Sequence, residues 1–164
     1  MDADVWEELY RKYYRSAVLY CIGLCGRQQL AEDIATDAFV KAYLSLPNDV
    51  TSFRYWLMKV CKNLWIDYLR KHSREIPDEY LPEMSDSTTL ETTYILNERN
   101  RYLWDIINTL PSFDREMLIL HYFSGLTLQE ISQLTGRTAP AVRTRMMRLR
   151  QTLKNKMEEY GYGI

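Results

Sequence analysis

The sequence predicts an all-α protein made of two small helical domains joined by a flexible acidic linker. Its 164 residues include only 6 Gly and 5 Pro, and apolar residues recur at helical spacing along most of the chain. This spacing is lost over residues 76–93, which contain two Pro, several Ser and Thr and many acids. We therefore expect a first domain over residues 1–75, a linker over 76–93, and a second domain over 94–164 that contains a helix-turn-helix.

The charges of the chain are segregated, although its formal net charge is only −1. Residues 51–75 contain six Lys or Arg against two Asp or Glu, and residues 138–164 contain the same numbers. Residues 76–100 have the opposite balance, with six acids and one base. Two separate basic blocks indicate two DNA contacts, and the acidic stretches indicate surfaces for a protein partner.

Two helices are expected before residue 47. The first covers residues 4–25 and ends at Gly26, and its apolar stripe consists of Trp6, Leu9, Tyr13, Ala17, Tyr20 and Leu24. The second covers residues 30–46 and is stopped by Pro47. Its inner face holds Ile34, Ala38 and Ala42, helped by Phe39, while its acidic residues stay outside.

A third helix is expected after the polar loop 47–52, with Ser52 as its cap. Its predicted core stripe is Phe53, Leu57, Val60 or Cys61, Leu64 and Tyr68. A neighbouring side carries Lys59, Asn63, Asp67 and Arg70, close to Trp56, Trp65 and several Tyr. Aromatic rings interleaved with cations suit unstacked single-stranded bases as well as phosphates. The alternative is that these rings belong to the core.

Two further helices lead to the C-terminal motif. One runs from about Leu90 to Thr109, and its predicted core residues are Ile95 or Leu96, Leu103, Ile107 and Leu110. Pro111 separates it from a helix that runs from about Ser112 to Phe123. Gly125 then ends that helix.

Residues 127–153 have the pattern of two helices joined by a glycine turn. Thr127 and Glu130 have the spacing of a capping box, and Gly136 can end the first helix. Thr138 can cap the second, with Pro140 in its first turn. The second helix has a core stripe of Val142, Met146, Leu149, Leu153 and Met157. Its opposite face carries Pro140, Arg143, Thr144, Met147, Arg148 and Gln151, flanked by Arg145 and Arg150. This pattern is typical of a helix-turn-helix with a DNA-reading helix, and the alternative is a helical hairpin with a solvated basic face.

The cysteines and some carboxylates of the chain are candidates for metal or catalytic groups. Three Cys without a framework spacing indicate reduced thiols in a cytoplasmic protein. Cys21 and Cys25 lie one turn apart and favour buried apolar packing over metal binding, because no further Cys or His pair is near. Glu32, Asp33 and Asp37 favour a solvated or partner-binding helix face over an acid–base site. We expect no signal peptide and no membrane span.

Three motifs, in order, resemble those of the extracytoplasmic-function (ECF) sigma factors of bacterial RNA polymerase. Residues 31–43, AEDIATDAFVKAY, are similar to the helix that grips the clamp helices of the polymerase. Residues 53–71, FRYWLMKVCKNLWIDYLRK, have the family's Phe-Arg-x-Trp-Leu start and its Asn-x-x-x-Asp-Tyr-Leu-Arg pattern. The segment from residue 110 looks like the family's second domain, with Pro140-Ala141 where Gly-Thr is frequent and Leu149 where Ala is usual.

The resemblance implies a specificity subunit that directs core RNA polymerase to promoter DNA and helps open the −10 region. It implies no catalytic residue, cofactor, metal or small-molecule substrate, and an anti-sigma factor as a further partner. Arg143, Thr144 and Arg148 are the expected base contacts, and Arg145 and Arg150 the expected phosphate contacts. The predicted −35 contacts are Thr138, Arg143, Thr144, Arg145, Met147, Arg148 and Arg150. The predicted −10 contacts are Asn48, Lys59, Lys62, Asn63, Asp67 and Arg70, and the predicted polymerase contacts are Asp33, Asp37, Phe39 and Lys41.

Two other classes of protein are open on the sequence alone. A stand-alone helix-turn-helix regulator would bind duplex DNA tightly without polymerase, usually as a dimer, yet the chain has neither coiled-coil heptads nor a ligand domain. A nucleic-acid enzyme using Glu32, Asp33 and Asp37 would show metal-dependent turnover. Promoter-specific transcription with core polymerase separates both from a sigma factor.

Overall fold

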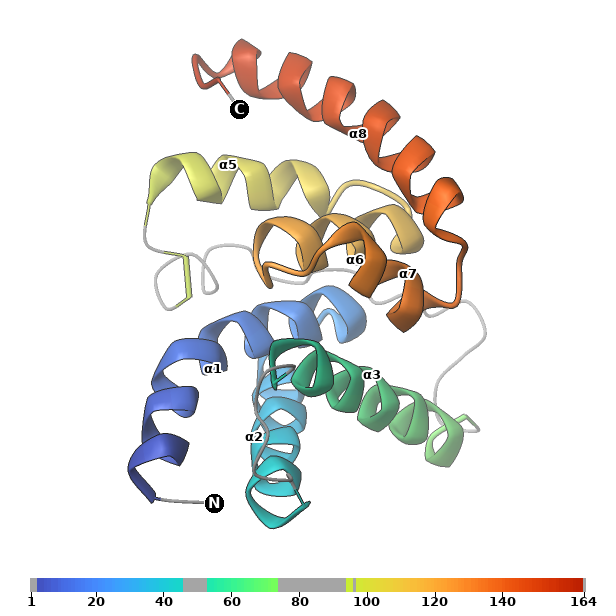
Figure 1. Ribbon diagram of the computed structural model, residues 1–164. Helices are drawn as coiled ribbons and strands as arrows, with labels where there is room; N and C mark the ends of the chain where they lie inside the picture. The colour runs from blue at the N-terminus through green and yellow to red at the C-terminus, as the bar shows by residue number, and fades with distance from the viewer. Residues whose placement is uncertain (1–2, 46–52, 74–93, 96, 164) are drawn as a thin grey trace. The chain divides into compact units, whose positions relative to one another are not determined.

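The computed structural model describes residues 3–45, 53–73, 94–95 and 97–163, and Figure 1 shows the seven helices found among them. No strand occurs in this described part of the chain. The chain divides near residue 85 into two compact units, which confirms the predicted all-α fold with two helical domains. The domain limits 1–75, 76–93 and 94–164 stay predictions, because residues 74–93 lie outside the described residues, as do Ser52 and its loop.

The first unit is a bundle of α1 (Ala3–Cys25), α2 (Gln28–Ser45) and α3 (Phe53–Lys71), each packed against the other two. Gly26 ends α1, as predicted, with a φ of 73°. The second half of α1 is buried on every side, since residues 17–23 are all buried in succession. The predicted apolar stripe therefore does not account for all the buried residues of this half, because α2 and α3 enclose it. A helix that is apolar all round is expected to be buried in this way.

The core of α3 lies in its first half. Phe53, Leu57, Met58 and Cys61 are buried, whereas the predicted core residues Leu64 and Tyr68 are only half-buried. From Lys62 to Ser73 no side chain of α3 is fully buried. The second half of the helix therefore contributes only partly buried and exposed side chains.

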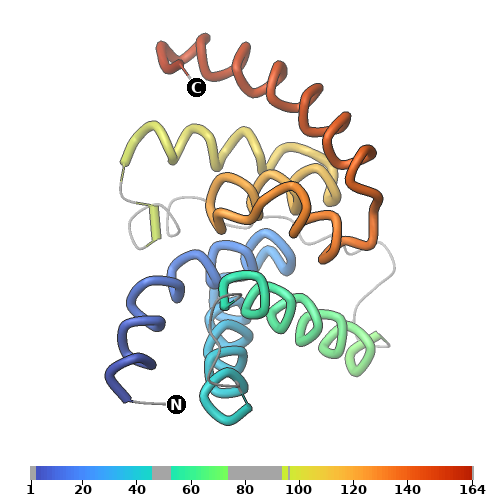
Figure 2. The backbone as a smooth tube through the Cα atoms, viewed as in Figure 1, coloured from blue at the N-terminus to red at the C-terminus, as the bar shows by residue number. Residues whose placement is uncertain are grey.

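The second unit consists of α5 (Glu98–Ile107), α6 (Ser112–Tyr122), α7 (Leu128–Thr135) and α8 (Ala139–Glu159). Four successive residues of α6, Met117–Leu120, are fully buried, so this helix forms the centre of the unit. Trp104 of α5 packs edge-on against Phe123, with ring centroids 5.3 Å apart. Figure 2 follows the long α8 from its start beside α7 to its last turns beside α5, where Tyr160 stacks on Tyr102.

The start of α5 differs from the prediction of about Leu90. The helix begins at Glu98, because Asn97 is its N-cap and the Asn97 side chain accepts a hydrogen bond from the backbone N–H of Asn100 at 2.7 Å. Ile95 is buried as expected, but it precedes the helix. The predicted start was too early because it was based on apolar spacing and did not take the Asn97 cap into account.

Candidate nucleic-acid interface

Side-chain caps fix the starts of α7 and α8, and a glycine ends α7 between them. Thr127 Oγ1 accepts from the Glu130 N–H at 3.1 Å, and Glu130 Oε1 accepts from the Thr127 N–H at 3.0 Å, which completes the predicted capping box. Gly136 ends α7 in the left-handed conformation, with a φ of 74°. Thr138 then caps α8 by accepting from the Ala141 N–H at 3.3 Å. These caps set where α8 begins and hence where each of its side chains points.

The two faces of α8 are separated as the sequence predicts. All five residues of the core stripe are buried: Val142, Met146, Leu149, Leu153 and Met157. All seven predicted −35 contacts are exposed residues, and even the apolar Met147 has 69% of its surface accessible. A rigid helix with an open arginine-rich face has the form that reads base edges in the DNA major groove.

Arg145 forms two hydrogen bonds to a buried carboxylate on another helix of the unit. Its Nε donates to Oδ1 of Asp114 at 2.7 Å and its Nη2 donates to Oδ2 at 2.8 Å. This hydrogen bonding raises the pKa of Arg145 above its ordinary value. Asp114 belongs to α6 and is only 4% exposed. The pair joins α8 to α6 and occupies two of the three guanidinium nitrogens of Arg145.

Arg150 is also engaged by a neighbour, His121 of α6. Arg150 Nη2 lies 3.0 Å from His121 Nε2, and His121 Nδ1 lies 3.2 Å from the Leu126 carbonyl oxygen. The carbonyl can only accept and the guanidinium can only donate, so His121 is neutral with its proton on Nδ1. Burial lowers the pKa of His121, the Leu126 carbonyl raises it, and the charge of Arg150 lowers it further.

The predicted −10 contacts on α3 lie on its solvent-facing side. Lys59, Asn63 and Arg70 are exposed, and Lys62 and Asp67 are half-buried. Arg70 and Asp67 form a solvent-exposed ion pair of 3.6 Å, a kind of contact that contributes little to stability. Asn48, the remaining predicted contact, lies outside the described residues.

Aromatic side chains accompany these polar groups along α3. The Trp65 and Tyr68 rings stack with centroids 5.6 Å apart, and Tyr68 stacks on His72 at 4.1 Å. Arg27, the residue before α2, donates from Nη2 to the Tyr68 hydroxyl at 3.1 Å. All three rings are half-buried. They are therefore not core residues, and their arrangement resembles a stacking platform for bases.

On α2, three of the four predicted polymerase contacts are exposed: Asp33, Asp37 and Lys41. Phe39 is only 1% exposed and packs against the rings of Trp6 and Tyr10, with centroids 5.3 and 5.2 Å away. This correction assigns Phe39 to the core rather than to a contact surface. Periodicity missed three exposed apolar neighbours near the end of α2, which are Val40, Tyr43 and Leu44.

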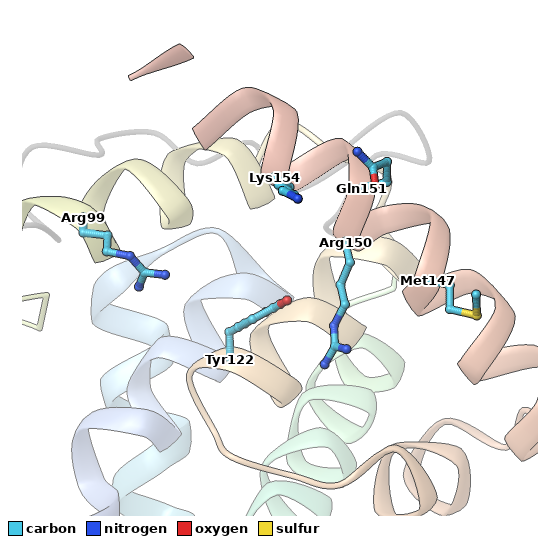
Figure 3. A pocket seen from close by; sticks show the side chains of 6 residues that line it. All are labelled: Arg99, Tyr122, Met147, Arg150, Gln151 and Lys154. Atoms are coloured by element: carbon cyan, nitrogen blue, oxygen red, sulfur yellow. The ribbon is translucent and has the colours of Figure 1, made fainter. Parts of the chain in front are cut away.

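A hollow between α5, α6 and α8 contains residues that the sequence did not single out. Figure 3 shows the Tyr122 side chain between the guanidinium groups of Arg99 and Arg150, with Lys154 on the α8 side. Arg99 precedes the helix-turn-helix by about thirty positions in the printed sequence, so no local motif connects it to α8. Only the packing of α5 beside α8 brings these cations together.

The described residues offer no alternative metal or membrane site. Nowhere in that part of the chain do three or more His, Cys, Asp or Glu side chains gather to hold a metal ion. Among the same residues no helix is long and apolar enough to cross a membrane. Cys21, Cys25 and Cys61 are free and buried, and burial raises the pKa of the Cys21 thiol well above its usual range. The Cys21 and Cys25 thiols therefore belong to the apolar core.

The fold and this surface define a two-domain helical DNA-binding protein with a helix-turn-helix in its second unit. The family model "Sigma-70 region 2" matches residues 9–75, and the model "Sigma-70, region 4" matches residues 100–153. The ECF RNA polymerase sigma factor SigM of Bacillus subtilis is 27% identical, over 90% of this chain and 92% of the relative. The ECF RNA polymerase sigma factor SigW of the same organism is 27% identical, over 96% and 91%.

A solved structure has the same fold. The sigma factor RpoE from Bartonella quintana, in complex with the anti-sigma factor NepR, matches with a TM-score of 0.64 and 20% identity over 96% of this chain and 98% of RpoE. The two family models together match both helical units, and the relatives match nearly end to end. The chain belongs to the extracytoplasmic-function family of RNA polymerase sigma factors.

Proposed function

We propose that this sigma factor directs core RNA polymerase to promoters through three separate contacts. In this proposal α8 reads the −35 element, α3 captures the opened −10 strand, and α2 binds the polymerase. The observation that carries it is the division of α8 into a fully buried stripe and an exposed arginine-rich face. The match of the two sigma-70 region models to the two units supports it.

At the −35 element, Arg143, Thr144 and Arg148 are assigned to base edges. Arginine can donate two hydrogen bonds to guanine O6 and N7, which discriminates against the other bases by about 1–3 kcal/mol. Thr138 and Met147 border this set on the same exposed surface. Arg150 is assigned to a phosphate. Arg145 is assigned a positioning role, because its bonds to Asp114 hold α8 on α6.

At the −10 element, the cations Lys59, Lys62 and Arg70 are assigned to phosphates of the opened strand. Asn63 is assigned to an exposed base edge together with Asp67, and Asn48, which lies outside the described residues, is assigned to the same strand. The rings of Trp65 and Tyr68 support this role, since stacking on aromatic side chains stabilises unstacked bases. Trapping the strand favours opening without hydrolysis, so the proposal includes no catalytic residue, cofactor, metal or small-molecule substrate.

For the polymerase contact, Asp33, Asp37 and Lys41 supply charge, and the exposed Val40, Tyr43 and Leu44 supply apolar area next to them. A surface of this kind, apolar with charged neighbours, is typical of protein interfaces. The solved RpoE is held by an anti-sigma factor, and we propose that a protein of that class binds this chain. Because its partner is RNA polymerase, we propose that it acts in the cytoplasm.

The test is transcription from a promoter library by core RNA polymerase, with and without the full chain. Added chain is expected to produce transcripts from a subset of promoters that share upstream and −10 sequences. The free chain is expected to bind those promoters poorly as duplexes, since a net charge of −1 gives it little non-specific affinity. Nanomolar duplex binding by the free chain, without promoter-specific transcripts, would support a stand-alone regulator instead.

A further inference from the structure

The hollow between α5, α6 and α8 carries a concentration of positive charge, of which only Arg150 is among the DNA contacts assigned above. Its volume is about 440 Å³, and its described lining residues are Arg99, Tyr122, Met147, Arg150, Gln151 and Lys154. Three of these six carry a positive charge and none carries a negative one. Tyr122 and Gln151 add hydrogen-bond donors. This set of groups fits an anion that is larger than a chloride ion and rich in oxygen acceptors.

Arg99 is held at the rim of this hollow by the residues that follow α8. Its Nε and Nη2 both donate to the Gly163 carbonyl oxygen, at 3.2 and 3.1 Å, and Nη1 takes no part in these bonds. Tyr160 and Tyr162 pack against Tyr102 of α5, with ring centroids 4.5 and 5.6 Å away. The guanidinium group is thus positioned before any ligand arrives, which lowers the entropy lost on binding.

The hollow is continuous with the exposed face of α8. Met147 and Gln151 belong to that face, and Lys154 follows Gln151 by one turn on the same side. A duplex that lies along this face brings the phosphates of one strand past the rim of the hollow, because phosphates flank every groove that a helix enters. Only Met147 among the lining residues is apolar, so the hollow offers little to the apolar anchor of a protein segment.

We infer that this hollow seats a phosphate group of the promoter DNA backbone at the edge of the −35 element, with Arg99 of α5 and Lys154 near the end of α8 as additional contacts. The inference rests on the proposed function, since it assumes that α8 lies on DNA. Such a contact carries no sequence information. It increases affinity for all upstream sequences alike and makes that affinity depend on salt.

The experiment compares Arg99→Gln and Lys154→Gln with wild type, each assembled with core RNA polymerase on a promoter library of randomised −35 elements at several salt concentrations. Lys156→Gln is the matched control, because Lys156 lies on the same helix but lines a different hollow beside Asp105 and Glu159. Each lost phosphate contact is expected to reduce the slope of log affinity against log salt by about 0.9. The loss is expected to be uniform across −35 variants, and the control is expected to match wild type.

Two results would contradict this inference. An unchanged salt slope in both variants would overturn it, and so would weaker binding of core polymerase with an unchanged slope, which would indicate an acidic protein segment in the hollow. Lys154→Gln decides the case if Arg99→Gln is unstable, because Lys154 makes no bond to a described residue that compares with that of Arg99 to Gly163. The absence of promoter-specific transcripts with wild type would refute the proposed function itself. In that case the phosphate contact is still tested by measuring how the free chain and its two variants bind non-specific duplex at low salt.

Discussion

Arg145 of α8 and Asp114 of α6 form a two-point ion pair, with Nε–Oδ1 and Nη2–Oδ2 distances of 2.7 and 2.8 Å. The Asp114 side chain is 5% exposed and the Arg145 side chain 47% exposed, so the carboxylate is the member that loses its water. The two residues are 31 positions apart in the sequence. Their bond fixes the start of the reading helix against the central helix of its unit.

Replacing Arg145 is therefore expected to destabilise the second unit. Arg145→Met leaves the buried Asp114 carboxylate unpaired, a state that costs far more than the loss of an exposed charge. Arg143→Met, a matched change two residues away on the exposed face, is expected to alter the free energy of unfolding by no more than about 0.5 kcal/mol. Urea unfolding of the full chain measures both. Equal stability of the two variants would show that the ion pair does not support the fold.

Arg148→Ala is expected to change promoter preference without unfolding the protein. Arg148 is exposed and lies away from the stripe that buries α8, so its truncation opens no cavity. Losing a bidentate base contact is expected to cost about 1–3 kcal/mol of discrimination at one base pair. Transcription from a −35 library at one salt concentration measures this. A uniform decrease over all variants would instead make Arg148 a phosphate contact.

Acid is expected to weaken the second unit through His121. Burial is the main reason why the pKa of His121 lies below its ordinary value of 6.5. The unfolded chain then binds the proton more readily, so the stability contribution is complete above pH 6.5 and is lost as the pH falls toward the lower folded value. His121→Gln keeps an acceptor for Arg150 but cannot titrate. Unfolding free energies at pH 7.5 and 5.5 should therefore differ more in wild type than in this variant, and equal differences would exclude His121 as the cause.

Asp37→Arg is expected to weaken binding to core polymerase while leaving α2 folded. Asp37 is exposed beside the apolar residues Val40 and Leu44, and reversing its charge places like charges together if the partner surface is basic. Glu8→Arg is a suitable control, because Glu8 is an exposed acid on α1 of the same unit. Co-purification with core polymerase compares the two variants. Equal recovery of both would remove Asp37 from the interface.

The sequence predicted those features that depend on neighbours along one helix. The spacing of Val142 and Met146 was enough to separate the two faces of α8, and Thr127 with Glu130 was enough to place the start of α7. Periodicity assigns a residue to a face but does not identify what covers it. It therefore could not pair Arg145 with Asp114.

Two of the remaining differences have the same physical origin, packing between helices, and a third is local. Phe39 was expected both to help the inner face of α2 and to contact the polymerase, and the packing of the Trp6 and Tyr10 rings from α1 assigns it to the core. Arg99 bonds to Gly163, 64 positions later, a contact that depends on how α8 returns to α5. The late start of α5 follows from one local cap at Asn97 that competed with an apolar pattern.

The separation of the two faces of α8 has a consequence for the evolution and engineering of promoter choice. The five stripe residues carry the packing of the helix, and the exposed residues Arg143, Thr144, Met147 and Arg148 contribute little to it. These four positions can accordingly be exchanged as a block while the scaffold stays constant. Under the proposed −35 assignment, a gene duplicate would acquire a new regulon through a few surface codons, and a set of mutually insulated transcription switches could be built on this one backbone.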